Sequence, residues 1–554
     1  MHLPATATRS EGGIDKAWLS PLVLFAGCVL LYSIHLGRMA HPDEYYHILA
    51  AKGLLETGEP RIAEGLYSRV FLHTWMVAKS FALFGESLAA ARIPSLLATA
   101  CLVVAMFVWL RREVGSLAAW IGAGLFALSP FAVEIAQFCR FYALQALAMF
   151  VAAIMVHGGV RVLRSQPRRA ALLLAGSALP IVLAIYLQAT SLLGCAGLGL
   201  WAAGAVGLPW LASRAVPPRH KIFAIAATLA LVGLVAAIAM YSGIADEFWQ
   251  QYRWAPYFNQ RSSDQFWYYH QWYSLLYPSL WPLTGFLTLL AITTLPWSAS
   301  MAALVFGVGF LLNSFAASKA LRYIAYAQPF LFVLWGIALA ALWPRLMAFA
   351  DRLRGRLTDQ LGGSRLLAAT LMVGAVLFLG VGNAATLRTV ALLADVTIPP
   401  EQPRTNWPAA RAELAPWLEQ ADVVVSTEEL GHLYFLGRYD VRFSPSKMDE
   451  LLPGEQHEFG LDHRTGRPVI GTRDSLERIL ECYPTGIIVG PSAHWGRPEL
   501  INSELSALIA AHAQELPLPA RSQLRAYVWE HGPATDAGGR CDGLPTFRKA
   551  ASAG

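Results

Sequence analysis

Two adjacent carboxylates, Asp43 and Glu44, stand in the stretch HPDEYYH at residues 41–47, immediately after the first long apolar segment. Charged groups beside a bilayer are costly unless they serve a purpose, so this cluster is a candidate site of chemistry. A carboxylate can accept the proton of an attacking hydroxyl, which makes Asp43 the candidate general base and Glu44 a second candidate catalytic residue. If a helix begins at Asp43, His47 lies on the same face and could support both. The alternative is that the pair only caps this helix.

Two later segments add cations and phenol hydroxyls, which suit the binding of a phosphate group because the arginine fork matches phosphate oxygens. The alternative is that the basic side chains extend to lipid headgroups without a substrate role. Glu134 could either form a structural pair with Arg140 or serve the site itself. Residues 129–147 contribute Glu134, Arg140 and Tyr142, and residues 318–329 contribute Lys319, Arg322 and Tyr323.

Metal binding stays open at this stage. Glu44 with His47, or His41 with His73, could ligate a divalent cation, and no cysteine spacing resembles a zinc or redox motif. The polar C-terminal region holds the cysteines Cys482 and Cys541. If that region lies outside the cytosol, these two could form a disulfide.

The elements that hold these residues are expected in a membrane. The chain has 554 residues, of which 55% are hydrophobic and 14% charged, whereas soluble proteins carry about 25% charged residues. The net charge of +6 does not indicate a nucleic-acid partner, because the basic residues fall mostly in short gaps between apolar segments. The composition therefore predicts a polytopic α-helical membrane protein.

The apolar segments predict about eleven transmembrane helices. They lie at residues 17–37, 94–110, 117–133, 141–160, 170–187, 191–212, 222–243, 281–297, 300–317, 324–343 and 366–384. Arginine and lysine concentrate in alternate gaps, which predicts that the N-terminal tail, residues 1–16, is cytosolic and that the C-terminus lies outside. No cleavage site follows the first segment, so we expect it to remain as a helix.

Two long segments, residues 38–93 and 244–280, are expected on the outer side. Apolar residues at helical spacing in the first predict helices along the membrane surface. The second is rich in Trp and Tyr, which serve as an interfacial anchor or stack on sugar rings. The transmembrane domain is expected to span residues 17–386. Residues 387–531 alternate β-like and helical runs and predict a soluble α/β domain, and residues 532–554 predict a disordered tail.

The order of several motifs resembles the GT-C superfold of membrane glycosyltransferases, and especially bacterial relatives of the protein O-mannosyltransferases and of the lipid A aminoarabinose transferase. The matching motifs are PDEYY at 42–46, FGES at 84–87 followed by ARIPS at 91–95, RFYAL at 140–144, and RY at 322–323 with Pro329. The resemblance covers about residues 15–390.

This resemblance implies an enzyme of the bacterial inner membrane that transfers a sugar from a polyprenyl-phosphate donor, usually with inversion, to an acceptor hydroxyl at the outer face. The acceptor could be a glycolipid, a polysaccharide or a protein, and membrane lipids are the other expected partners. Asp43 is then the expected base. The side chains expected to stabilise the leaving phosphate are Arg140, Tyr142, Lys319, Arg322 and Tyr323.

Two other classes of function remain open. A transporter or flippase of lipid-linked glycans needs polar residues along a path within its helices, whereas the charges here cluster at helix ends and in outer loops. A membrane-anchored binding protein that acts through its C-terminal domain leaves Asp43 and the arginines without a use. Release of free polyprenyl phosphate from a sugar-loaded carrier distinguishes the transferase from both.

Overall fold

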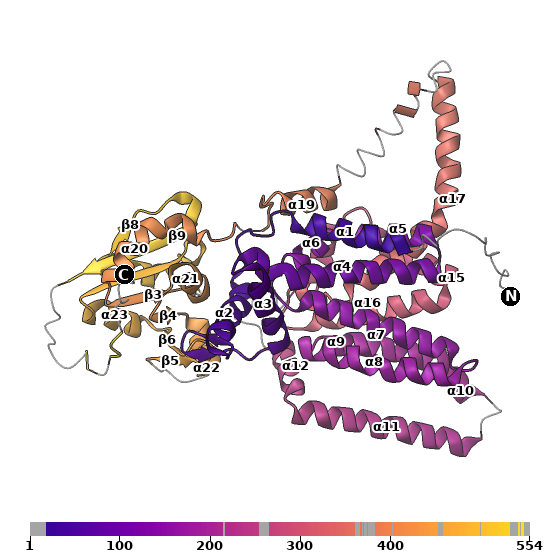
Figure 1. The fold of residues 1–554 in the computed structure, drawn as a ribbon, viewed down its shortest axis with the longest axis horizontal. Coiled ribbons are helices and arrows are strands. Elements are labelled where there is room, and N and C mark those ends of the chain that lie inside the picture. Colours follow the sequence, from indigo (N-terminus) through magenta and orange to yellow (C-terminus); the bar gives the residue numbers. More distant parts are fainter. Residues whose placement is uncertain are drawn as a thin grey trace.

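The computed structural model of the chain describes residues 18–213, 217–253, 265–360, 366–367, 369–370, 374, 383–401, 403–452, 458–498, 500–531, 541–542 and 544–547. Its apolar helices form an elongated bundle, and the C-terminal α/β domain lies at one end of that bundle (Figure 1). Two helices from residues 38–93, α2 (Pro42–Thr57) and α3 (Phe71–Phe84), lie between the bundle and the domain (Figure 1).

The bundle consists of helices joined mostly by short connections. They are α1 (Leu19–Ser33), α4 (Leu88–Glu113), α5 (Ser116–Ala127), α6 (Pro130–Ala136), α7 (Tyr142–Val162), α8 (Pro167–Leu187), α9 (Ser191–Ala202), α10 (Leu208–Ala212), α11 (Pro218–Tyr241), α12 (Ile244–Arg253), α14 (Tyr268–Leu276), α15 (Thr284–Thr294), α16 (Pro296–Phe315), α17 (Gln328–Gln360) and α19 (Ala384–Leu393). Among the described residues, 5 helices are long and apolar enough to cross a membrane, or up to 8 if each bent pair is one span. The number of about eleven stays a prediction, because the expected helix at 366–384 lies mostly outside the described residues.

Some helices begin or end at residues other than those predicted, because capping residues determine where a helix starts. α4 begins at Leu88 rather than at residue 94, because the Ser87 hydroxyl accepts a hydrogen bond from a main-chain N–H in the first turn. The single helix expected at 117–133 is divided into α5 and α6 with a bend of 62°. Ser129 caps α6 and Pro130 occupies its first position, which favours a new helix start there.

Residues 38–93 form helices, as predicted, with a short antiparallel hairpin between α2 and α3; their position along the membrane surface stays a prediction. The hairpin consists of β1 (Arg61–Ile62) and β2 (Gly65–Leu66). It lies directly against α2, since a Cβ atom added at Gly53 would be 2.3 Å from the carbonyl oxygen of Arg61. Glycine at that position therefore allows the close approach of helix and hairpin.

The C-terminal α/β domain is built on a seven-stranded sheet of order β5-β6-β4-β3-β7-β9-β8. The central strand β3 pairs in parallel with β4 and β7, and its four residues, Val423–Ser426, are all buried. A fully buried run of this kind is typical of a central parallel strand covered on both faces. The remaining elements are α20 (Arg411–Gln420), α21 (Glu429–Leu436), β4 (Val441–Phe443), α22 (Pro445–Leu451), β5 (Gly460–Asp462), β6 (Arg467–Ile470), α23 (Arg473–Cys482), β7 (Thr485–Pro491), α24 (Ser503–His512), β8 (Gln514–Leu516) and β9 (Leu524–Glu530).

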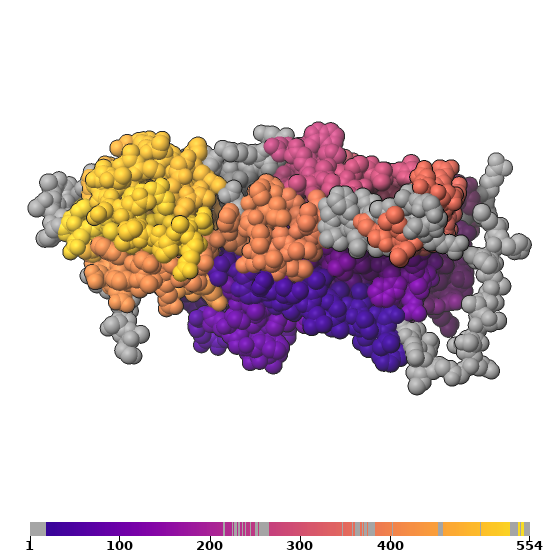
Figure 2. All heavy atoms as spheres, turned by 90° about the horizontal axis from the view of Figure 1, so that it is seen from above, coloured from indigo at the N-terminus to yellow at the C-terminus, as the bar shows by residue number. Residues whose placement is uncertain are grey.

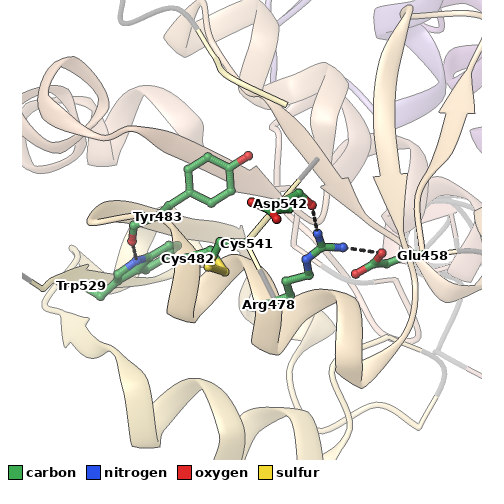
Figure 3. The surroundings of a disulfide bond; sticks show 7 residues. All are labelled: Glu458, Arg478, Cys482, Tyr483, Trp529, Cys541 and Asp542. Atoms are coloured by element: carbon green, nitrogen blue, oxygen red, sulfur yellow. Dashed lines mark hydrogen bonds and ion pairs between the residues drawn. A yellow bond between two sulfur atoms is a disulfide. The ribbon is translucent and has the colours of Figure 1, made fainter. Parts of the chain in front are cut away.

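A disulfide joins this domain to the chain's last segment. Cys482, at the end of α23, is bonded to Cys541 with an S–S distance of 2.05 Å (Figure 3). Next to it, Arg478 contacts the Asp542 carbonyl (Figure 3), and the ring of Phe547 packs on Tyr483. We expect disorder from residue 532 onward on composition, but the described residues 541–542 and 544–547 pack against the domain instead.

The α/β domain docks on the hairpin through both main-chain and side-chain contacts. The Glu64 N–H donates to the Thr465 carbonyl at 3.1 Å, and two guanidinium nitrogens of Arg467 donate to the Glu64 carboxylate at 2.8 and 3.1 Å. A Cβ atom at Gly65 would lie 2.5 Å from the Gly466 nitrogen, so this close approach requires glycine at position 65. Figure 2 shows the orange and yellow atoms of this domain directly against the indigo atoms of the N-terminal part.

The same domain also contacts α2 itself. The ring of Tyr45 lies 5.6 Å from that of Tyr434 and 6.0 Å from that of Phe435, both on α21. The Arg464 guanidinium lies 5.0 Å from the ring centre of Tyr46. α2 is therefore held by the α/β domain as well as by the bundle.

Candidate active site

The first turn of α2 is fixed by a reciprocal cap. The Asp43 N–H donates to Nδ1 of His41 at 3.2 Å, and the His41 N–H donates to Oε1 of Glu44 at 2.8 Å. Pro42 occupies the first helical position, where its missing N–H costs nothing. The predicted helix therefore forms, and its cap uses the side chain of Glu44 but only the main chain of Asp43.

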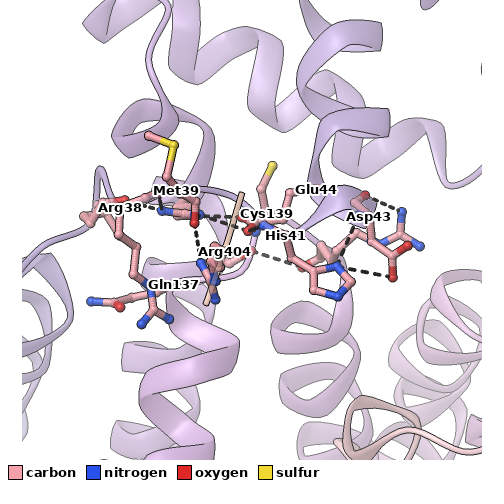
Figure 4. Close-up of polar contacts among 12 residues, drawn as sticks. Arg38, Met39, His41, Asp43, Glu44, Gln137, Cys139 and Arg404 are labelled. Carbon is pink, nitrogen blue, oxygen red and sulfur yellow. Dashed lines mark hydrogen bonds and ion pairs between the residues drawn. The ribbon is translucent and has the colours of Figure 1, made fainter. Parts of the chain in front are cut away.

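Glu44 is saturated by partners inside the protein. Arg92 Nε and Nη2 donate to its two oxygens at 2.8 and 2.9 Å, and both side chains are 0% exposed. The Cys139 N–H donates to the same carboxylate at 2.8 Å (Figure 4). Burial alone raises the pKa of Glu44, but the charge and hydrogen bonds of Arg92 outweigh it and bring the pKa to about 2. Arg92 Nη1 also donates to the carbonyls of Leu36 and Arg38, each at 2.7 Å.

Asp43 differs from its neighbour in exposure and in partners. Its side chain is 31% exposed, and its Oδ2 forms an ion pair with Nη2 of Arg322 at 2.9 Å. Nδ1 of His41 lies 3.9 Å from the same oxygen, but it accepts a hydrogen bond from the Asp43 N–H and so carries no proton there. Burial raises the pKa of Asp43, while Arg322, Arg140 and Arg69 together lower it well below its usual range.

Arg140 approaches Asp43 from the segment between α6 and α7. Its Nη1 donates to the main-chain carbonyl of Asp43 at 3.1 Å and lies 3.4 Å from the Tyr67 hydroxyl. Its guanidinium lies 5.0 Å from the ring centre of Phe141, and its buried Nε has no hydrogen-bond partner in the part of the chain that the structure describes. Among the described residues, no carboxylate lies within ion-pair distance of Arg140, so Glu134 does not pair with it.

Arg322 approaches from the short helix η5 (Leu321–Ile324), which follows α16. Its guanidinium lies 5.4 Å from the ring centre of Tyr323, and its side chain hydrogen-bonds that of Tyr142. The rings of Tyr142 and Tyr323 lie 6.4 Å apart. The three chain segments selected from the sequence therefore meet at one end of the bundle, around the Asp43 carboxylate.

Lys319 and Glu134 take different places. The Lys319 side chain is 2% exposed, and its Nζ donates to the Ala316 carbonyl at 2.5 Å. Glu134 is exposed on α6 and interacts electrostatically with Arg38 and Arg322. The structure thus buries the ammonium group and leaves the carboxylate accessible near the arginines.

The side chain of His47, in the second turn of α2, is buried and does not face solvent. Its Nδ1 and the Thr74 hydroxyl are 2.9 Å apart, and its ring lies 4.8 Å from that of His73. Burial lowers the pKa of His73 to about 3, so its ring is neutral. In the described part of the chain, no group of three His, Cys, Asp or Glu side chains could hold a metal ion, and both oxygens of Glu44 are already occupied.

Sequence reasoning missed the arginines that hold the approach to α2. Arg404, from the linker before the α/β domain, donates to the Met39 carbonyl at 2.5 Å (Figure 4). Arg38 donates through Nη1 to the Leu392 carbonyl at 3.1 Å, while its buried Nε and Nη2 have no hydrogen-bond partner among the described residues. The ARIPS motif includes Arg92, but the sequence does not show that this residue pairs with Glu44. The proline-rich linker contains no pattern that predicts the contact of Arg404 with Met39.

No protein-family model matches the chain, and no curated protein sequence matches it. Among solved structures, ArnT from Cupriavidus metallidurans, a lipid A aminoarabinose transferase, is similar over 93% of this chain and 98% of its own. Its apo structure has 17% identity and a TM-score of 0.57, and its structure bound to undecaprenyl phosphate has 16% and 0.55. AglB, an oligosaccharyltransferase from Archaeoglobus fulgidus, has a TM-score of 0.48, with 12% identity over 86% of this chain and 70% of that one.

The ArnT comparison covers both the helical bundle and the α/β domain. The chain therefore has the GT-C fold of membrane glycosyltransferases, as the motifs suggested. Together with its apolar helices, this fold identifies a multi-pass membrane protein.

Proposed function

We propose that the protein transfers a sugar from a polyprenyl-phosphate carrier to an acceptor hydroxyl, with inversion at the anomeric carbon. The observation that carries this proposal is the convergence of one accessible carboxylate, Asp43, with the guanidinium groups of Arg140 and Arg322. These groups come from three distant segments of a GT-C chain. The donor class is supported by the structure of ArnT bound to undecaprenyl phosphate, which shares the fold.

In the proposed reaction, the acceptor oxygen forms a bond to the anomeric carbon while the bond from that carbon to the phosphate oxygen breaks. The hydroxyl proton passes to the Asp43 carboxylate, and the bonding electrons pass to the phosphate. General base catalysis of this kind contributes about 10²–10⁴-fold. A phosphate leaves readily without a general acid, so the remaining task is to stabilise its growing charge.

We assign that task to Arg140 and Arg322, with the hydroxyl groups of Tyr142 and Tyr323 as further partners. Arg140 suits it because it has no carboxylate counter-ion among the described residues, and its Nε lacks a hydrogen-bond partner. Fixed cations aimed at a developing charge lower the barrier because they need no reorganisation during the reaction.

Glu44 and Lys319 receive other roles in this proposal. Because Arg92 and main-chain N–H groups occupy both oxygens of Glu44, we assign it to positioning α2 instead of to proton transfer. Lys319 is buried against the Ala316 carbonyl and is assigned to holding the turn before η5. His47 supports α2 from below, and Glu134 remains an accessible carboxylate beside the arginines.

We place the reaction on the outer face of the bacterial inner membrane. Basic residues concentrate in the gaps expected on the opposite side. The α/β domain, which contacts α2 next to the site, contains the Cys482–Cys541 disulfide. Disulfides persist outside the cytosol and are rare inside it.

The test is a turnover assay on the full chain purified in detergent. A panel of sugar-loaded polyprenyl phosphates is offered with candidate acceptors, and release of free polyprenyl phosphate is measured. Asp43→Asn is expected to lower this rate by about 10²–10⁴-fold. Wild-type turnover in that variant removes Asp43 from the mechanism.

The matched control is Asp351→Asn. Asp351 lies on α17, is 62% exposed and pairs with Arg354 on the same helix, so its loss is expected to leave turnover unchanged. Thermal unfolding of both variants verifies that they fold. If the wild-type chain releases no polyprenyl phosphate from any loaded carrier, the proposed class of reaction is wrong.

A further inference from the structure

The two arginines beside Asp43 are compensated differently. Arg322 is neutralised by the Asp43 carboxylate at 2.9 Å. Arg140 donates to the main-chain carbonyl of Asp43 and to the Tyr67 hydroxyl, and among the described residues no carboxylate lies within ion-pair distance of it. Asp43, the proposed base, therefore forms an ion pair with Arg322, one of the two arginines that we assign to stabilising the leaving phosphate.

His41 does not substitute for Arg322 as a counter-ion. Its Nδ1 faces Asp43 as a hydrogen-bond acceptor for the Asp43 N–H, so it presents a lone pair instead of a positive charge. Within 4.0 Å of the Asp43 carboxylate, Arg322 is thus the permanent cation in the described part of the chain.

The Asp43–Arg322 ion pair can be exchanged. The Asp43 side chain is 31% exposed and that of Arg322 27% exposed, so an anion from solution or membrane can reach both. An ion pair of this exposure contributes little stability, because water screens both charges. The pair of Glu44 with Arg92 cannot exchange in this way, because it is 0% exposed on both sides.

We propose that the donor's phosphate group competes with Asp43 for Arg322, so that donor binding releases the Asp43 carboxylate toward the acceptor hydroxyl. This inference rests on the proposed function. An arginine-paired carboxylate is a weak base, because the cation stabilises its charged form. Transfer of Arg322 to the phosphate removes that stabilisation, so Asp43 becomes a stronger base only when a donor is present.

The exchange also resets the site. After transfer, the acceptor proton resides on Asp43 and the sugar-free phosphate on the arginines. When the polyprenyl phosphate leaves, Arg322 returns to Asp43, favours the ionised carboxylate and drives the proton into solvent. No further reactant is required.

The experiment is a binding measurement with undecaprenyl phosphate as the probe, on full-length protein in detergent. Because binding couplings are reciprocal, removing the competing carboxylate must strengthen binding of the phosphate. Because the competing ion pair is weak, Asp43→Asn is expected to bind the probe about two- to fivefold more tightly than the wild type, although it is the inactive variant. An equal or weaker affinity overturns the inference.

A double-mutant cycle separates exchange at Arg322 from general charge repulsion. In an Arg322→Gln background, Asp43→Asn is expected to change the affinity by less than about twofold, since no shared cation remains. The same gain in that background as in the wild type overturns the exchange. Glu134→Gln is the matched control, because Glu134 is an exposed carboxylate near the arginines with no ion pair among the described residues. Its gain is expected to be smaller than that of Asp43→Asn, and an equal gain overturns the inference.

The outcomes distinguish this inference from the proposed function. If the wild type binds the probe and Asp43→Asn abolishes turnover without tighter binding, the exchange is wrong and the transferase proposal stands. If the wild type does not bind undecaprenyl phosphate at all, the donor class is wrong and the exchange falls with it.

Discussion

The two carboxylates at the start of α2 face different surroundings. Glu44 is enclosed, with Arg92 and main-chain N–H groups on its oxygens, whereas Asp43 is partly exposed and paired with Arg322. A step of one residue turns the side chain by about 100° around a helix, which is enough to direct one carboxylate into the protein and the other to its surface. The same chemical group is thus a buried structural anchor in one place and an accessible carboxylate in the other.

The difference shows how accessibility decides the role of an ionised side chain. A buried pair cannot lose one member without leaving an unpaired charge, so it fixes geometry. An exposed pair is weak and exchangeable, so it can take part in a binding cycle. The buried pair of Glu44 with Arg92 fixes α2, and α2 carries Asp43, the carboxylate of the exposed pair.

The largest expected effect comes from breaking the buried pair. Arg92→Met leaves Glu44 enclosed without a counter-ion and is expected to destabilise the protein by about 3–5 kcal/mol, measured as thermal unfolding in detergent. The control is Arg161→Met, since Arg161 pairs with Glu113 but is 59% exposed. It is expected to cost about 1 kcal/mol or less. Equal losses in the two variants contradict the contrast between buried and exposed pairs.

The exposed pair should respond in activity instead of stability. Arg322→Gln is expected to lower turnover by about 10²–10³-fold, because it removes one cation from the developing phosphate charge. The same variant should change stability by only about 0–1 kcal/mol. A loss of stability as large as that of Arg92→Met shows instead that Arg322 has a structural role.

Acid should weaken the buried pair within a defined pH range. The pKa of Glu44 is about 2 in the folded chain, against its usual 4.5. Since the unfolded chain binds the proton first, the stabilisation is complete above about pH 4.5 and is lost as the pH falls toward about 2. The full contribution is on the order of 3 kcal/mol. The difference in unfolding temperature between wild type and Glu44→Gln is expected to shrink over that range, and a constant difference contradicts it.

The smallest effect is expected at a second exposed pair, which tests whether exposure is the deciding variable. Glu64 is 64% exposed and pairs with Arg467 of the α/β domain. Glu64→Gln is expected to change stability by about 1 kcal/mol or less, with turnover unchanged. A loss comparable to that of Arg92→Met means that the docked interface, and not exposure, sets the strength of such pairs.

Much of the arrangement could be predicted from the sequence because it depends on apolar length and on charge between helices. These signals predicted the membrane helices, the α/β domain and the meeting of Asp43, Arg140 and Arg322 on one side. Each of these depends on local composition or on the alternation of sides along the chain.

The rest depended on tertiary contacts. Nothing in the sequence distinguishes the role of Glu44 from that of Asp43, because the distinction comes from Arg92, which lies 48 residues away. Lys319 has the same charge as the arginines, but its burial against Ala316 cannot be read from its neighbours. The sequence does not predict that residues 544–547 pack against the domain, because the composition of residues 532–554 resembles that of a disordered tail.

The hairpin contact between Glu64 and Arg467 joins positions 403 residues apart. At about 5–20 residues per second, roughly 20–80 s separate the synthesis of its two sides. During that interval the young chain carries Asp43 on α2 without the domain that packs against this helix. The surfaces that hold α2 are therefore complete only after Arg467 has been translated, and a product that terminates before this residue lacks one of them.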